Sequence, residues 1–191
     1  MGSYLKKSCL ALYLPYNKQI MKALELIKTR RSIRKFSKKS IPEKTIEKVL
    51  EAGSWAPSGL NNQPWRFMVL GGEKKNFLAK YTHYSYIIKG ADKIILVFLD
   101  KKSSYNYEKD LMAIGASIQN MLLYIHSQKL GACWLGEILN KRKEIGNLLK
   151  VPRNLELEAV LAIGESQARL LRGKRKRIRD LVVKRDSLVV I

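Results

Sequence analysis

A chain of 191 residues with 46% hydrophobic residues is long and apolar enough to form one domain with a buried core. Its 37 basic and 16 acidic residues give a net charge of +21. Such a charge can serve binding to nucleic acids or to membrane surfaces, but it is spread along the chain, with one dense patch at residues 169–185. Charge alone therefore names no partner. No apolar run reaches about 20 residues, which argues against a membrane span.

Residues 1–16 are predicted to be an N-terminal extension ahead of a single domain at residues 17–191. The apolar stretch of the extension is short, and no small-residue cleavage site follows it, so we do not expect a signal peptide. The two cysteines, Cys9 and Cys133, have no metal-type spacing and provide no disulfide framework. This pattern favours a cytoplasmic protein in which Cys133 is a buried apolar residue.

The N-terminal part is predicted to hold two helices separated by a basic turn. Asn17 could cap the first helix, whose apolar residues recur at helical spacing: Ile20, Ala23, Leu24 and Ile27. A basic turn follows at residues 29–36, and Pro42 suits the first turn of the second helix. The inward residues of that helix are Ile46, Val49 and Leu50. Residues 55–65 are predicted to be irregular, because prolines, a glycine and asparagines interrupt them.

Strands and further helices are predicted after this loop. Residues 66–70 favour a strand ended by Gly71 and Gly72, and residues 73–80 favour a short helix. Residues 93–99 form the clearest strand, and their continuous apolar run predicts that both faces are covered. A helix at residues 107–129, ended by Gly131, has an apolar surface broader than one stripe, which is typical of a central or interface helix.

The C-terminal part is predicted to continue with a helix capped by Asn140 and then a strand at residues 155–163, closed by Gly164. The inward residues of that helix are Ile145, Leu148 and Leu149. Residues 187–191 are predicted to be a terminal strand. Helices and strands are mixed without regular βαβ repeats, so the pattern predicts an α+β fold.

Several well-known site motifs are missing from the sequence. It contains no G-x-G-x-x-G, no G-x-x-x-x-G-K-[ST] and no G-x-S-x-G, so dinucleotide-binding Rossmann, P-loop and serine-hydrolase sites are not supported. The two histidines, His83 and His126, have no metal-ligand partner at useful spacing, so no metal site is expected. His126 lies on the long predicted helix, where a packing role is favoured over catalysis.

Three segments hold residues suited to binding. Arginines and a serine at residues 30–34 offer forked donors and a hydroxyl to a phosphate or to flavin oxygens; a solvated helix end is the alternative. Residues 57–65 concentrate small and amide side chains, which can hydrogen-bond a heteroaromatic ring; an ordered turn is the alternative. Residues 131–137 contain glycines, which allow a ligand to approach the backbone closely.

Together and in this order, the three segments resemble the nitroreductase family of flavoproteins, and the resemblance runs from about Leu24 to Val183. It implies an α+β fold around a mixed or antiparallel sheet. It also implies a domain-swapped homodimer with two FMN sites at the interface between its subunits.

The resemblance also assigns site residues. The residues that it places at the phosphate and the ribityl chain are Arg30, Arg31 and Ser32. It places Arg34 near flavin N1 and O2, where a cation would stabilise an anionic reduced flavin. The loop that reaches the FMN of the partner subunit contains Pro57, Ser58, Asn61 and Gln63. The segment beside flavin N5 is Leu135, Gly136 and Glu137. Arg175 falls at a further phosphate position, although Arg177 and Arg179 depart from the proline and acid common in the family.

The implied activity is a ping-pong reduction, driven by NADH or NADPH, of small electron-poor acceptors such as nitroaromatics, quinones or flavins. No side chain is expected to act as acid or base, because the cofactor supplies the chemistry. Reductive dehalogenation or flavin fragmentation is an alternative, but those branches usually add lids, for which only residues 82–90 and 101–107 offer space. A flavin-binding protein without turnover is another. A nucleic-acid-binding protein is disfavoured by missing motifs and by the lack of aromatics among the basic residues.

Overall fold

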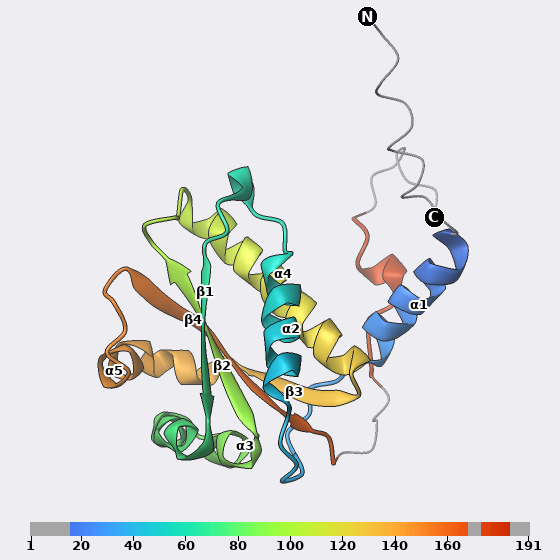
Figure 1. The fold of residues 1–191 in the computed structure, drawn as a ribbon. Helices are drawn as coiled ribbons and strands as arrows, with labels where there is room; N and C mark the ends of the chain where they lie inside the picture. Colours follow the sequence, from blue (N-terminus) through green and yellow to red (C-terminus); the bar gives the residue numbers. More distant parts are fainter. Residues whose placement is uncertain (1–15, 168–172, 184–191) are drawn as a thin grey trace, which may run out of the picture.

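The computed structural model describes residues 16–167 and 173–183, with side chains from Ala23 on. Its centre is a four-stranded antiparallel sheet in the order β1-β2-β4-β3 (Figure 1). The strands are β1 (Trp65–Gly71), β2 (Lys93–Asp100), β3 (Leu130–Leu135) and β4 (Leu155–Glu165). Helices cover both faces of this sheet, which confirms the predicted α+β class.

One face of the sheet is covered by α2 (Glu43–Ser54) and α4 (Tyr107–Ser127). Alternate residues of β2 point to this face because successive side chains of a strand lie on opposite sides. The β2 residues that pack here are Ile95, Val97 and Leu99, and α4 packs against them with Ile114, Ile118, Met121 and Ile125. The inward positions predicted for α2 are correct, with Ile46 and Val49 buried and Leu50 partly buried.

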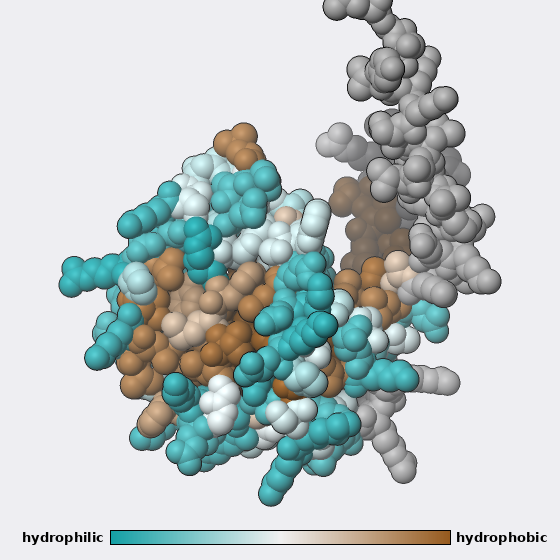
Figure 2. Space-filling model, viewed as in Figure 1, coloured by the Kyte–Doolittle hydropathy of each residue, from teal (hydrophilic) through white to brown (hydrophobic). Residues whose placement is uncertain are grey.

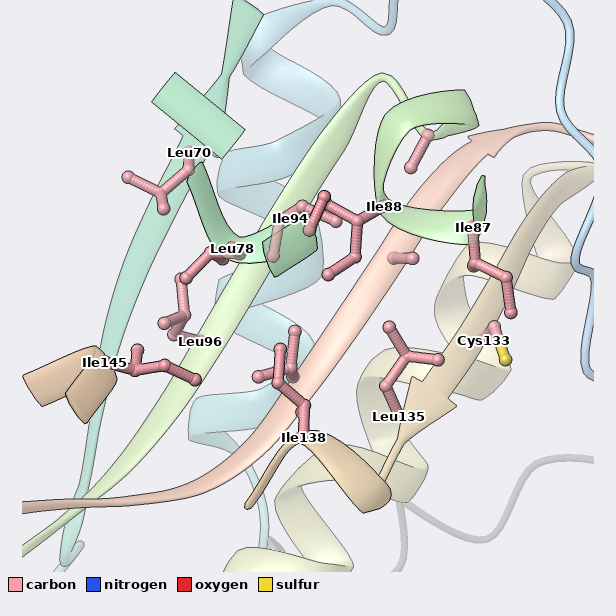
Figure 3. Close-up of a cluster of buried hydrophobic side chains, with 14 of the residues drawn as sticks. Leu70, Leu78, Ile87, Ile88, Ile94, Leu96, Cys133, Leu135, Ile138 and Ile145 are labelled. Carbon is pink, nitrogen blue, oxygen red and sulfur yellow. The ribbon is translucent and has the colours of Figure 1, made fainter. Parts of the chain in front are cut away.

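The opposite face is covered by η3 (Gly72–Tyr81), α3 (Ser85–Gly90), η4 (Glu137–Lys141) and α5 (Arg142–Leu148). Figure 3 shows the core of this layer, where Ile87 and Ile88 of α3 lie with Ile94 and Leu96 of β2. Both faces of β2 are therefore buried, as its continuous apolar run predicts. Gly72 has a φ of 54°, in the left-handed region, and ends β1 at the predicted place.

A β-bulge interrupts the pairing of β2 with β4. Phe98 pairs with Leu157 and Val97 pairs with Ala159, so Glu158 is an extra residue on β4. The bulge changes the alternation of β4: Leu157 and Val160 share the α5 face, whereas Ala159 faces α4. The Glu158 side chain is 8% exposed and lies 3.5 Å from Arg142 Nη1.

The first helix, α1 (Tyr16–Thr29), contacts α4 and projects beyond the C-terminal end of α4 (Figure 1). Leu24 and Ile27, predicted as its apolar face, are exposed in this chain. Near α1 lies η5 (Ile178–Asp180), where Ile178 and Leu181 are also exposed. Hydrophobic atoms gather over this region in Figure 2, so α1 has an apolar surface that the described residues leave uncovered.

Several predicted boundaries are wrong. Asn17 lies inside α1, which begins at Tyr16. The long helix ends at Ser127 because Lys129 adopts a left-handed φ of 60°, and Gly131 lies within β3. Lys141, rather than Asn140, precedes α5.

Other differences concern elements that the sequence pattern did not reveal. Leu148 is exposed, although Ile145 is buried as expected. The short elements β3 and α3 were not predicted, and Gly164 lies within β4 instead of ending it. The predicted terminal strand at residues 187–191 and the extension at residues 1–15 lie outside the described residues.

Candidate functional site

The basic turn after α1 lies along the edge strand β3. Ser32 forms a parallel bridge with Ala132, and Ile33 N donates to Ala132 O at 2.8 Å. Further on, Phe36 bridges Ser166, just beyond β4. These backbone bonds fix residues 30–36 on the sheet and place Ser32 near the start of β3.

Two glycines make this close approach possible. A Cβ on Gly131 would lie 2.7 Å from Ile33 Cγ2, and a Cβ on Gly164 would lie 2.8 Å from the Phe36 side chain. Real Cβ atoms do not tolerate such distances, so the backbone needs glycine at both positions. The sequence predicts Gly131 as a point of ligand approach, whereas the structure shows that Ile33 occupies the space above it.

Three arginines gather where this segment begins. A Cβ on Gly173 would lie 2.7 Å from Arg31 Nη2, which shows how closely the C-terminal segment passes. Burial lowers the pKa of Arg30, and the nearby charges of Arg175 and Arg31 lower it further. Arg30 and Arg175 form no ion pair with any carboxylate in the described ranges. We call Arg30, Arg31 and Arg175 the cation cluster; its mutual repulsion would be relieved by a bound dianion.

His126, near the C-terminal end of α4, lies beside the cation cluster. Thr29 Oγ1 and His126 Nε2 are 2.9 Å apart and form a hydrogen bond between α1 and α4. Burial lowers the pKa of His126, and the charges of Arg30 and Arg31 add to this effect. The neutral ring therefore joins the two helices, in agreement with the packing role expected for it.

Arg34 and Cys133 lie further along the same edge. Arg34 is exposed, whereas Cys133 is buried as predicted. Burial raises the pKa of the Cys133 thiol, and the charge of Arg34 offsets this only in part. The thiol is consequently a neutral packing group, and Arg34 is the group at this position that can meet a ligand.

The segment after β3 leaves space at the other end of the strand. Leu135 points into the core (Figure 3), so only its backbone can face a ligand. Gly136 is exposed, and a Cβ there would meet nothing within 4 Å. The next residue is held in place, because Glu137 Oε2 accepts a hydrogen bond of 2.6 Å from Thr82 Oγ1. From Ala132 to Gly136 the chain advances about 13 Å, the extended length of four strand residues.

The loop at residues 57–63 has an unusual backbone. Leu60, Asn61 and Gln63 all have φ values between 47° and 54°, in the left-handed region that side chains rarely adopt. Strain of this kind persists only where surrounding contacts impose it, and it is common at binding sites. Gln63 N donates to Ser58 Oγ at 3.1 Å, while Leu60 is 86% exposed at the tip.

Asn62 anchors this loop, a role that sequence reasoning missed. Its Nδ2 donates to Asp110 Oδ1 at 2.8 Å and to Ser103 O at 3.0 Å. Asp110 is fully buried and also accepts a bond of 2.6 Å from Ser104 Oγ. Burial alone would raise the pKa of Asp110, but the hydrogen bonds from Ser104, Asn62 and two backbone amides outweigh burial and lower it.

The loop and the cation cluster lie at opposite ends of α4 (Figure 1). The loop is bound to Asp110 in the first turn, and the cluster lies beside His126 in the last turn. These residues are 16 positions apart, which is about 24 Å at 1.5 Å per residue. One chain therefore brings Arg30, Arg31, Ser32, Arg34 and Arg175 together along β3, but keeps Pro57, Ser58, Asn61 and Gln63 away from them.

Among the described residues, no group of three or more His, Cys, Asp or Glu side chains is arranged to hold a metal ion. In the same part of the chain, no helix is long and apolar enough to cross a membrane. The fold and site together define an α+β protein with a cluster of three arginines at the edge of an antiparallel sheet.

The chain belongs to the nitroreductase family, whose sequence profile matches residues 27–84 and 73–165. A protein of Archaeoglobus fulgidus, assigned as an NADH dehydrogenase/NAD(P)H nitroreductase, is 34% identical over 146 residues, 74% of this chain and 83% of the relative. An iodotyrosine deiodinase of Thermotoga neapolitana is 28% identical over 166 residues, 73% of this chain and 86% of the deiodinase.

Solved structures agree with this classification. A crystal structure from Desulfovibrio desulfuricans, described as a nitroreductase in complex with FMN, superposes with a TM-score of 0.81 and 42% identity. The match covers 85% of this chain and 95% of that protein. The predicted fold class is thereby confirmed. The individual site residues remain predictions.

Proposed function

We propose that the protein is an FMN-dependent oxidoreductase that takes electrons from NADH or NADPH and reduces small electron-poor acceptors. The observation that supports this most strongly is the cation cluster at the start of the β3 edge, with the open position at Gly136 beyond its other end. A mononucleotide with a terminal phosphate suits this arrangement, because its dianion would relieve the repulsion among the arginines. The structural relative is described as an FMN complex, and the Archaeoglobus relative has an NAD(P)H nitroreductase name.

In this proposal, different residues along the β3 edge bind different parts of FMN. Arg30, Arg31 and Arg175 hold the phosphate, and Ser32 meets the ribityl chain. When bound, FMN supplies two-electron transfer between donor and acceptor, which no protein side chain provides. Arg34 orients the pyrimidine side of the ring and favours negative charge there. Gly136 leaves one side of the ring accessible, and Glu137 is fixed beside it by Thr82.

We further propose that the functional unit is a domain-swapped homodimer. The loop at residues 57–63 lies too far from the cation cluster of its own chain to share one FMN with it, so it would serve the FMN of the partner subunit. Exposed apolar residues support such an interface: Leu24, Ile27, Trp55, Leu60, Met112, Ile178 and Leu181. A monomer that exposed them all would present an extensive apolar surface to water.

The space above the site favours a broad range of nitroaromatic, quinone or flavin acceptors. Most of residues 82–90 belong to α3, which is fixed to the core because Ile87 and Ile88 are fully buried. Residues 101–107 form a short turn held at both ends by Asp100 and Asp110. Within the described ranges, neither stretch provides a lid. The deiodinase relative keeps reductive dehalogenation as the second candidate activity.

The first test is the spectrum of the purified protein. We expect flavin absorbance, or its appearance after reconstitution with FMN, and bleaching of the flavin by NADH or NADPH under anaerobic conditions. A nitroaromatic, a quinone and free FMN should reoxidise the reduced enzyme, whereas a halogenated tyrosine should do so slowly or not at all. A protein that cannot take up FMN would refute the proposal, and preferential turnover of the halogenated tyrosine would replace it with dehalogenation. A flavin that binds but is not reduced would indicate a binding protein without turnover.

The cytoplasm is the location that we propose, because Cys133 is a buried thiol without a disulfide partner among the described residues and reducing compartments favour free thiols. Nucleic-acid binding is not favoured by any observation on the described surface beyond charge. A salt titration in a filter-binding assay checks this, since phosphate contacts would give a steep loss of binding with salt.

A further inference from the structure

A pocket on the α5 side of the sheet is separate from the proposed flavin site. Its volume is about 330 Å³, and it lies between α5, the following turn and the paired ends of β2 and β4. None of its lining residues belongs to residues 30–36, 57–63 or 131–137. The lining residues that matter to the argument are Phe98, Leu157, Lys101, Arg142, Lys143 and Arg153.

The floor of this pocket is apolar. Phe98 and Leu157, which pair across β2 and β4 just before the bulge, are only 2% and 3% exposed. Val151 and Leu155 extend the apolar surface at the side. An apolar body of a ligand would therefore leave water and pack against close-fitting side chains.

The rim of the pocket is basic, and its cations fall into two groups. Glu156 forms ion pairs with Lys101 Nζ at 2.7 Å and with Arg142 Nη1 at 2.9 Å. Arg142 forms a second ion pair with the buried side chain of Glu158. Lys143 and Arg153, in contrast, form no ion pair within the described part of the chain. Two cations that form no ion pair with the described residues thus border an apolar floor, and the ion pairs of Glu156 and Glu158 fix the pocket wall beside them.

We propose that this pocket binds a small organic anion with an apolar body, whose carboxylate lies between Lys143 and Arg153 and whose chain packs on Phe98 and Leu157. The volume is at the lower end of small-molecule sites, about 300–1,000 Å³, so a ligand of roughly six carbons fits better than a nucleotide. This binding does not depend on the proposed flavin chemistry.

The test uses the FMN-loaded full-length protein with hexanoate as the probe and hexanamide as its uncharged counterpart. Binding is followed by calorimetry, and its place by the backbone amide NMR shifts of Asn147 and Leu157, with Gly136 as the reporter of the flavin site. The test variant is Lys143→Gln/Arg153→Gln. The matched control, Lys44→Gln/Lys74→Gln, removes the same charge from surface positions away from the pocket. Inorganic phosphate tests whether charge alone suffices.

We expect saturable hexanoate binding with shifts at Asn147 and Leu157, and at least about tenfold weaker binding to the test variant, because two charge-assisted contacts are lost. The control variant should bind as the parent does, and all three proteins should keep the same flavin content. Equal binding of hexanamide, equal binding of phosphate, shifts confined to Gly136 or no effect of the test variant would each overturn the proposal. Failure of the parent protein to take up FMN, with intact hexanoate binding, would refute the proposed function and would not affect the proposal for this pocket.

Discussion

Asn62 and Asp110 are joined by a hydrogen bond of 2.8 Å that fastens a strained loop to the first turn of α4. The bond unites positions 48 residues apart in the chain. Asp110 is buried and charged, and its four hydrogen-bond donors come from the loop and from the turn before α4. The conformation of residues 57–63 therefore depends on one carboxylate outside the loop.

Asp110→Asn should loosen this loop and destabilise the protein by about 2 to 4 kcal/mol, since bonds to a charged group are stronger than neutral ones and a buried donor loses its partner. Urea unfolding measures the change in the free energy of unfolding. Glu108→Gln is the control, because Glu108 is exposed in the same turn and should change stability by less than about 0.5 kcal/mol. An equal effect of the two substitutions would contradict the anchoring role.

The same pair predicts a pH dependence. The folded-state pKa of Asp110 lies below its ordinary value of 3.8, so its contribution is present above the unfolded pKa and is lost as the pH falls through the folded pKa. The stability difference between the wild type and Asp110→Asn should therefore be constant above about pH 5 and shrink below about pH 4. A difference that grows on acidification would show that the sign is wrong.

Arg30→Gln/Arg175→Gln should weaken FMN binding by about 100-fold or more, because each charged hydrogen bond contributes about 1.5 to 3 kcal/mol. The apoprotein should not lose stability, since repulsion with Arg31 is relieved. Fluorescence titration with FMN and thermal unfolding of the apoprotein measure the two effects. Lys176→Gln removes a charge from the same exposed segment and serves as the control. Equal losses of FMN affinity in both proteins would point to general charge instead of the cation cluster.

Mixing two inactive variants tests whether each site draws on two chains. One variant is Arg30→Gln/Arg175→Gln, and the other is Asn61→Ala/Gln63→Ala. If the loop serves the partner's FMN, a mixed dimer contains one site with both halves intact and one with both halves altered. Co-refolded mixtures should then regain flavin binding and activity at up to about half of the sites present in mixed dimers. No recovery in verified mixed dimers would mean that both halves act within one chain.

Gly131→Ala should displace Ile33 and shift the basic turn from β3, with a cost of about 1 to 3 kcal/mol from overpacking. FMN affinity should fall with it, because Ser32 and Arg34 flank the displaced residue. Gly146→Ala is the matched control, since it lies inside α5 with nothing within 4 Å of the added methyl group. That substitution should stabilise the protein by up to about 1 kcal/mol. Thermal unfolding and flavin content distinguish the two.

Glu158→Gln should stabilise the protein at neutral pH by about 1 kcal/mol, because burial raises the pKa of Glu158 despite the opposing charge of Arg142. An acid with a raised folded-state pKa destabilises the fold once the pH exceeds its ordinary value of 4.5, so the benefit should vanish below that pH. Glu156→Gln should do the opposite, since its bond to Lys101 lowers the pKa of Glu156. The free energy of unfolding, measured at pH 4 and pH 7.5, distinguishes the two residues. If both substitutions changed it in the same direction at pH 7.5, the opposite pKa shifts of Glu156 and Glu158 would be refuted.

The elements that the sequence predicts well are those whose pattern reflects burial directly. The apolar run of β2 and the inward positions of α2 follow from repetition along one element. The six residues of β3 lack such a signal, because Gly131 has no side chain and the space above it is filled by Ile33, and because the pairing of β3 with β4 is nonlocal. Leu148 was misplaced because α5 ends there and leaves it in solvent.

The candidate site divides in the same way. Arg30 and Arg31 were predicted because their residue type suits phosphate, and Arg175 was predicted from the family resemblance. The approach of Gly173 to Arg31 is a tertiary contact that no local pattern encodes. Asn61 and Gln63 were predicted as ligand-binding residues and Asn62 was not. The sequence pattern of an asparagine in a loop is the same whether its side chain binds a ligand or a buried carboxylate. An acidic residue at position 110, on the buried side of α4, was the available signal, and interaction with the helix dipole explains an acid in the first turn equally well.

The length of α4 has a thermodynamic consequence for the proposed dimer. Because that helix separates the two halves of a site, neither FMN uptake nor subunit association can be complete without the other, and the two equilibria are linked by mass action. Apparent flavin affinity should consequently rise with protein concentration. Because the dimer has two sites, saturating FMN should lower the dissociation constant of the dimer by the square of the factor by which dimerisation raises the affinity of each site. Dilution would then release cofactor and subunit together.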